Sequence, residues 1–178
     1  SYQVSELSDM GVKYAYSNTD YDEEGLEDYD ANSVILSYNR KFNEGLDIFS
    51  IQPGYTRLSS DSSDDDGYRL TFGWTHLPSE TYRLKIFLGT RYTEQDYKDD
   101  RDKTSNWGGV ADISLLKKAE IYSVLIGFNS DVYSGPSTSE LKKVYKIYCN
   151  LTRRVTERFS AGVNSRLKRS VPVRVKLQ

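Results

Sequence analysis

Apolar and polar residues alternate with a period of two along most of the chain. From Tyr82 to Tyr92 one set of alternate residues is largely apolar, and the other set contains Arg83, Lys85 and Arg91. Successive side chains of a β-strand point to opposite sides, so this alternation predicts strands with one apolar and one polar face. The predicted strands cover residues 9–18, 33–42, 46–58, 68–77, 81–93, 107–116, 120–129, 141–153 and 157–168, with 171–177 as a candidate tenth.

Short breaks and long polar breaks take turns between these segments. The tight breaks are residues 43–45, 78–80, 117–119 and 156–157, and the long ones are 19–32, 59–67, 94–106 and 130–140. The long breaks are rich in Asp, Ser and Gly, which is typical of loops. Residues 141–153 also fit helical spacing, but their Tyr, Val and Ile content favours a strand. The repeating unit is therefore a β-hairpin, and the long loops are expected at one end of the sheet.

This pattern fits two kinds of all-β fold. A soluble sandwich turns its apolar faces toward a second sheet, whereas a membrane barrel turns them toward lipid. The regular order of short turns and long loops, the length of the strands and the aromatic residues near strand ends favour the barrel. We predict one domain over residues 1–178, an antiparallel up-and-down transmembrane β-barrel of about 8–10 strands, alone or as part of a larger barrel. It has short periplasmic turns and long acidic extracellular loops.

Charges are segregated along the chain although the net charge is only −2. The four long loops hold 18 of the 26 acidic residues and 3 of the 24 basic residues, which leaves a basic body under acidic loops. Soluble proteins usually mix both signs over their surface. Most of the basic strand residues alternate with the apolar ones, so a barrel would turn them toward its lumen. The predicted lumen-lining residues are Lys13, Arg69, Arg83, Lys85, Arg91, Asp112, Lys142, Lys146 and Arg166.

Aromatic residues lie near the ends of the predicted strands. Tyr and Trp are enriched where membrane proteins cross the boundary between lipid and water. The predicted girdle residues are Tyr16, Tyr68, Trp74, Tyr82, Tyr92, Trp107 and Tyr122. No stretch approaches 18 consecutive apolar residues, which argues against a membrane-spanning helix. No basic and apolar leader follows Ser1, so any secretory signal has been removed or was never there.

The segment from Thr152 to Ser160, Thr-Arg-Arg-Val-Thr-Glu-Arg-Phe-Ser, and the Ser- and Asp-rich loop 59–67 carry a resemblance. They resemble bacterial outer-membrane β-barrels, in particular the porin-like barrels found with exopolysaccharide export and exosortase systems. The resemblance implies a location in the bacterial outer membrane. The chain departs from such barrels in two ways: nine clear strands instead of an even number, and no aromatic residue at its end.

Candidate catalytic and ligand-binding groups are few. His76 is the only histidine and adjoins a predicted turn, which suits an interfacial residue better than a general base. Cys149 alternates in phase with apolar residues and is expected to be inert. Residues 61–67 carry oxygen ligands suited to Ca²⁺ but lack EF-hand spacing, so a solvated loop is the simpler interpretation. We predict no enzyme, no resident metal and no cofactor.

Passive translocation needs no catalytic residue, and a cationic wall favours anions. The expected function is porin-like passage of anionic solutes or exopolysaccharide, with lipid and lipopolysaccharide as surroundings. Two alternatives stay open: a closed, non-conducting barrel that acts as a structural or adhesion module, and a soluble carbohydrate-binding domain. Nucleic acid is not an expected partner, since the pI is about 5.5. The sequence leaves the oligomeric state open.

Overall fold

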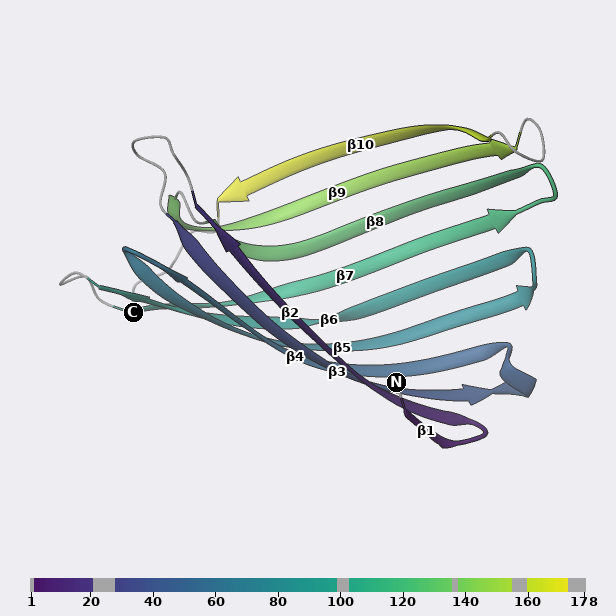
Figure 1. Cartoon of the computed structure of the whole chain (residues 1–178), viewed down its shortest axis with the longest axis horizontal. Helices are drawn as coiled ribbons and strands as arrows, with labels where there is room; N and C mark the ends of the chain where they lie inside the picture. Colours follow the sequence, from purple (N-terminus) through teal and green to yellow (C-terminus); the bar gives the residue numbers. More distant parts are fainter. Residues whose placement is uncertain (1, 21–27, 99–102, 136–137, 155–159, 173–178) are drawn as a thin grey trace.

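The computed structural model describes residues 2–20, 28–98, 103–135, 138–154 and 160–172. They form one antiparallel sheet in which each strand pairs with its neighbours in the chain, in the order β1 to β10. The sheet is strongly curled, with β2 passing in front of the following strands and β10 at the top (Figure 1). The strands are β1 (Tyr2–Ser5), β2 (Ser8–Thr19), β3 (Tyr29–Phe42), β4 (Asp47–Ser60), β5 (Ser63–Ser79), β6 (Tyr82–Tyr97), β7 (Thr104–Lys118), β8 (Tyr122–Gly135), β9 (Thr138–Arg154) and β10 (Ser160–Pro172), and η1 (Asn43–Gly45) is a short 3-10 helix.

The register gives the sheet an apolar face and a polar face. Phe72 of β5 lies opposite Ile51 and Leu88, and all three point to the apolar face. The preceding residue, Thr71, points to the polar face and lies opposite Gly89. This division continues across the sheet because each strand keeps the period-two alternation of its sequence. The prediction of amphipathic strands is confirmed.

Burial in this sheet is inverted relative to a water-soluble domain. Among the residues whose side chains the structure describes, the buried hydrophobic ones are only Val110, Val132 and Val144, whereas eleven buried ones are polar or charged. Large apolar side chains are exposed instead, with Phe72 at 57% and Trp107 at 67%. The polar face is on the hollow side of the curl, and the apolar face is on its outer side. None of the helices in the described part of the chain is long and apolar enough to span a membrane.

The connections alternate between two ends of the sheet. We call the turn end the one that holds the β3–β4, β5–β6 and β7–β8 connections, and the loop end the one that holds β4–β5 and β6–β7. At the turn end, η1 places Asn43, Glu44 and Gly45 at positive φ, which matches the predicted tight break. The predicted break 156–157 lies outside the described residues.

The predicted long loops are wrong in their extent. The strands continue into them, so that β4 reaches Ser60, β5 begins at Ser63, and the supposed loop 59–67 is a tight hairpin. A polar sequence indicates exposure to water, but it does not exclude a strand. The backbone hydrogen bonds between two strands continue where side chains on the opposite strands can pair. Here Arg57 and Ser59 both contact Asp64 on the opposite strand.

Nine predicted strands correspond to β2–β10, including β9, whose sequence also fitted a helix. The four-residue β1 was missed, because so short a segment shows no clear alternation. The candidate tenth strand 171–177 overlaps only the end of β10, and residues 173–178 lie outside the described part of the chain. The Arg-Arg-containing segment that carries the family resemblance is likewise described only in part.

The predicted closure into a barrel is not present, and the sheet is open. β1 pairs only with the first residues of β2, up to Met10, and the described strands include none that pairs with the outer edge of β10. The backbone edge of β2 from Gly11 to Thr19 is therefore also an edge of the sheet. β2 and β10 run in the same direction, since eight antiparallel steps separate them, so they are not a matched antiparallel pair.

Candidate functional site

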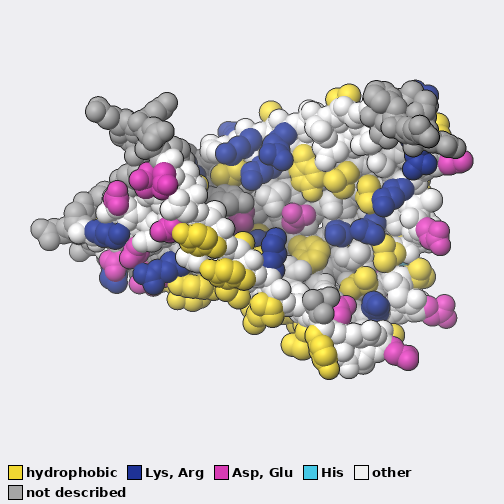
Figure 2. All heavy atoms as spheres, in the orientation of Figure 1, with side chains coloured by type: hydrophobic (Ala, Val, Ile, Leu, Met, Phe, Trp, Pro, Cys, Tyr) yellow, Lys and Arg dark blue, Asp and Glu magenta, His cyan; other side chains and the backbone are white. Residues whose placement is uncertain are grey.

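The polar face holds every residue that the sequence predicted for a lumen. Cross-strand pairing connects them into rows: Lys13 lies in one row with Arg69 and Arg91, and Lys85 lies in another with Arg166. Basic side chains gather in the hollow between β2 and β10 (Figure 2). Their use as the lining of a pore stays a prediction. The residues on this face are Lys13, Arg69, Arg83, Lys85, Arg91, Asp112, Lys142, Lys146 and Arg166.

Aromatic side chains form a continuous row on the apolar face toward the loop end. Tyr55, Tyr68, Tyr92 and Trp107 lie opposite one another on β4 to β7. Their successive ring centroids are 5.3, 6.3 and 5.1 Å apart. Such ring pairs stabilise the strand pairing. Sequence reasoning identified three of these four residues and missed Tyr55, although Tyr55 lies as close to the end of its predicted strand as Trp74 does.

The other predicted girdle residues point to the same apolar face. Trp74, Tyr82 and Tyr122 lie toward the turn end, and Tyr16 lies on β2 toward the loop end. From β4 to β8, this face carries no Asp, Glu, Lys or Arg between the loop-side aromatic row and the level of Trp74. The result is an uncharged band bordered by aromatic rings.

A cluster of three charges lies on the polar face behind the loop-side aromatic row. Arg69 and Arg91 are direct cross-strand neighbours. Like charges placed directly opposite destabilise a sheet, and Asp131 offsets this repulsion. Its two carboxylate oxygens lie 3.7 Å from an Nη1 atom of each arginine. Asp131 is itself held by the Val132 backbone N–H, which donates to Oδ1 at 2.8 Å.

The cluster borders a cavity of about 290 Å³ on the hollow side of the sheet. Gly67 leaves room for the Arg91 side chain, because a Cβ atom at position 67 would lie 2.9 Å from Nη2 of Arg91. Three residues with hydroxyl side chains, one leucine and two aspartates line the cavity together with the two arginines and Gly67. The lining residues are Ser33, Thr56, Leu58, Asp65, Gly67, Arg69, Arg91, Thr93 and Asp131. Sequence reasoning missed Asp131, because it fell in the predicted loop 130–140.

No protein-family model, curated protein or solved structure matches this chain. The features that bear on its function are the two faces of the sheet and the charged cluster.

Asp65 lies in the same cavity, three residues beyond Tyr68 and thus outside the uncharged band. Asp65 is 4% exposed, and this burial raises the pKa of its carboxyl group to about 6, against the opposing effect of hydrogen bonds with Gln95 and Ser63. The folded state therefore binds this proton more tightly than the unfolded chain does. Between pH 4 and 6 the contribution of Asp65 to stability falls as the pH rises.

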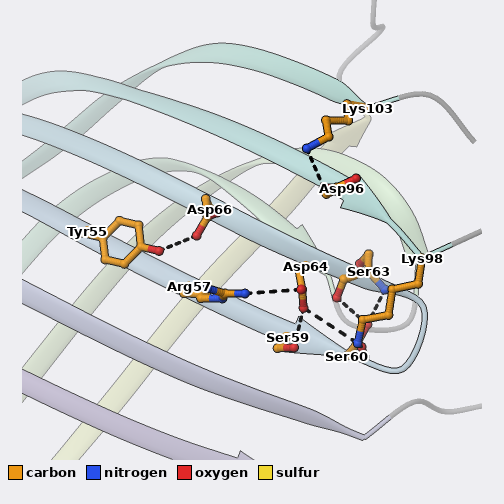
Figure 3. A network of polar contacts seen from close by, with 10 residues as sticks. All are labelled: Tyr55, Arg57, Ser59, Ser60, Ser63, Asp64, Asp66, Asp96, Lys98 and Lys103. Atoms are coloured by element: carbon orange, nitrogen blue, oxygen red, sulfur yellow. Dashed lines mark hydrogen bonds and ion pairs between the residues drawn. The ribbon is translucent and has the colours of Figure 1, made fainter.

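Polar contacts continue outside the band at the loop end (Figure 3). Tyr55 donates a hydrogen bond to Asp66 at 2.5 Å, and Lys98 forms an ion pair with Asp64 at 3.8 Å. Lys103 contacts Asp96 at 2.6 Å, and this hydrogen bond raises the pKa of the lysine. These contacts explain how strands so rich in acidic residues stay paired.

His76 takes part in a small polar cluster at the turn end of the apolar face. Asp47 accepts the Trp74 indole N–H at 3.0 Å through Oδ1, and the same oxygen lies 2.7 Å from Nδ1 of His76. Asn43 donates to the other carboxylate oxygen at 3.1 Å. The arrangement fixes the Trp74 ring, which stacks on His76 with centroids 5.5 Å apart. His76 thus lies close to the β5–β6 turn, as the sequence predicted, and its interfacial role stays a prediction. The described residues include no cluster of three His, Cys, Asp or Glu side chains suited to a metal ion.

Replacing Asp47 with Ala is expected to destabilise the folded chain by about 1–2 kcal/mol, because Trp74 and Asn43 lose an ionised acceptor at a partly exposed site. Urea unfolding in detergent micelles, followed by tryptophan fluorescence, measures the effect. Replacement of Glu120, an exposed residue of the β7–β8 turn, is the control and is expected to change the unfolding free energy by less than about 0.5 kcal/mol. Equal midpoints for the two variants would contradict a structural role for Asp47.

Proposed function

We propose that this chain forms the wall of a bacterial outer-membrane β-barrel, whose polar face lines a passage for anionic solutes or exopolysaccharide. The inverted burial carries the proposal: apolar side chains are exposed on the outer face, while the buried side chains are mainly polar. In water, so large an exposed apolar surface would be unfavourable and prone to association. In lipid, the same surface is the stable arrangement.

The height of the uncharged band supports the proposal. On β6 the uncharged stretch of the apolar face runs from Tyr82 to Tyr92, which are ten residues apart. Ten residues extend about 33 Å along a strand at about 3.3 Å each. Strands of outer-membrane barrels tilt by about 35–45°, which reduces this length to about 25 Å across the membrane. That value equals the typical apolar height of such barrels.

The proposal requires that the sheet close, because hydrocarbon cannot satisfy an open backbone edge. β2 and β10 run in the same direction, so one strand antiparallel to both fits between them. β1 already occupies the turn end of that slot, beside Ser8 to Met10. In the proposed barrel, a full-length strand on the line of β1 pairs with the edge from Gly11 to Thr19 and with β10.

The charged face then becomes the lumen, with bases in excess over acids among the predicted lining residues. A cationic wall in a narrow, low-dielectric passage concentrates anions. The acidic residues of the loop end lie outside the band, where cations bridge them to lipopolysaccharide in this proposal. An adhesion or scaffold barrel with a filled lumen is the competing function and predicts no conductance.

The purified chain is expected to fold in detergent micelles and not in plain buffer, with a shift in gel mobility on boiling. In planar bilayers it is expected to conduct, with a preference for anions that weakens when Arg83 and Arg91 are both replaced by Gln. Reversal potentials in a KCl gradient measure this preference. A monomer folded in buffer would support the soluble carbohydrate-binding domain, and a folded but non-conducting barrel would overturn the transport proposal.

A further inference from the structure

We propose that Arg69 and Arg91 form a carboxylate-binding station at the loop-side mouth of the lumen, which Asp131 occupies in the absence of an anionic ligand. This inference deepens the proposed function and rests on it for the role of the station in transport. The binding itself depends only on the folded polar face.

Arg69 and Arg91 are neighbours across β5 and β6, so both guanidinium groups lie within reach of one small anion. A guanidinium binds a planar carboxylate with two parallel hydrogen bonds, and charge-assisted bonds of this kind are about 2.7–2.9 Å long. The Asp131 oxygens lie at 3.7 Å from the two Nη1 atoms, too far for a hydrogen bond. Asp131 therefore neutralises the pair without making the bonds that a fitted carboxylate would make.

The side chains of Arg69 and Arg91 are 32% and 15% exposed, whereas that of Asp131 is 5% exposed. The arginines thus face the cavity more openly than the internal carboxylate does. A ligand can approach them from the hollow side and replace Asp131 at the guanidinium groups, while the Val132 backbone N–H still donates to Oδ1 of Asp131.

Ser33, Thr56 and Thr93 line the same cavity as the two arginines. Their hydroxyl groups can donate to and accept from the hydroxyl groups of a sugar. The shared chemistry is the carboxylate group, which either a simple organic acid or an acidic sugar supplies. Asp65 opposes an incoming anion less than an exposed aspartate would, because its raised pKa keeps part of it protonated near pH 6.

Calorimetric titration of the full chain in detergent micelles, at one fixed pH and low salt, tests the station with acetate, glucuronate and glucose. We expect acetate and glucuronate to bind and glucose not to bind. Tighter binding of glucuronate than of acetate would assign the hydroxyl groups of the wall to the site, and equal binding would assign the carboxylate alone; both support the station. Binding of glucose as tight as that of glucuronate would overturn it.

Arg91→Lys keeps the charge but loses the planar pair of donors, and it is expected to weaken glucuronate binding about tenfold. Arg69→Lys is the second variant, should the first fail to fold. Asp131→Asn removes the internal competitor and is expected to strengthen binding several-fold. The matched control is Arg57→Lys, at the same end of the sheet on the apolar side, where Arg57 pairs with Asp64 and is 53% exposed. Its expected change is less than twofold.

Two further results would overturn the station: no carboxylate binding by the unchanged chain, or an equal loss in Arg91→Lys and Arg57→Lys. Failure of the proposed function is distinguishable from both. A chain that binds glucuronate in micelles but conducts no ions in bilayers would retain the station and lose the transport role. A chain that conducts anions without the Arg91→Lys effect would retain transport and lose the station.

Discussion

Replacing Leu88 with Arg is expected to reduce the stability of the bilayer-inserted chain by about 2–4 kcal/mol. Leu88 lies near the middle of the uncharged band, between the aromatic rows, and its side chain is 52% exposed on the apolar face. A lipid-facing arginine at the bilayer midplane costs this amount in transmembrane barrels, and the cost decreases toward the interfaces. Urea unfolding in lipid vesicles measures the difference, with the folded fraction taken from the heat-modifiable band on a gel.

Asn164→Arg is the matched control for this prediction. Asn164 pairs with Asn150 on the polar face, so the new charge faces the hollow side of the sheet. We expect a change below about 1 kcal/mol, since surface substitutions away from packed sites are usually small. If both variants lost the same stability, the two faces would not differ in their surroundings, and the proposed membrane orientation would have to be abandoned.

The faces of the strands were predictable from sequence because the side-chain period of a strand is two. Arg83 and Arg91 are separated by an even number of positions within β6, so an extended backbone places both side chains on the same face. The same period of two predicted that Trp107 and Tyr122 lie on the apolar face of their strands. Hairpin order also followed from the breaks, since tight turns impose antiparallel neighbours.

The ends of the strands were less predictable, for a physical reason. Acidic residues such as Asp64 and Asp66 lower the tendency to form strands, and their composition resembles that of a loop. Cross-strand partners reverse this tendency: Arg57 and Ser59 contact Asp64, and Tyr55 donates to Asp66. Such pairs depend on the register, which the sequence of one strand does not contain.

The charged cluster lay beyond sequence reasoning for the same reason. Asp131 is about 40 residues or more away from both arginines along the chain, and its position depends on β8 continuing through a stretch that reads as a loop. The openness of the sheet was also not foreseen, because alternation specifies the neighbours of a strand and not the number of strands that closes a ring.

Replacing Gly89 with Ala is expected to destabilise the fold by about 3 kcal/mol or more. Gly89 lies on the polar face beside β5, where a Cβ atom would lie 2.1 Å from the backbone oxygen of Leu70 and 2.7 Å from Cα of Thr71. Overpacking of side chains typically costs about 1–3 kcal/mol. Here the obstacle is backbone, which yields only by separating β5 from β6, so the cost belongs at or above the top of that range.

Gly109 supplies a control of opposite sign. It lies one strand away, opposite Thr90 on the apolar face, and a Cβ atom there would meet nothing within 4 Å. Gly109→Ala is therefore expected to stabilise the chain by about 0.4–1 kcal/mol, because alanine has less conformational freedom to lose on folding. Urea midpoints in micelles, with the refolded fraction from heat modifiability, compare the two variants. Equal stability would mean that β5 and β6 do not approach as closely at Gly89 as the structure requires, and that the tight curl of the polar face has another cause.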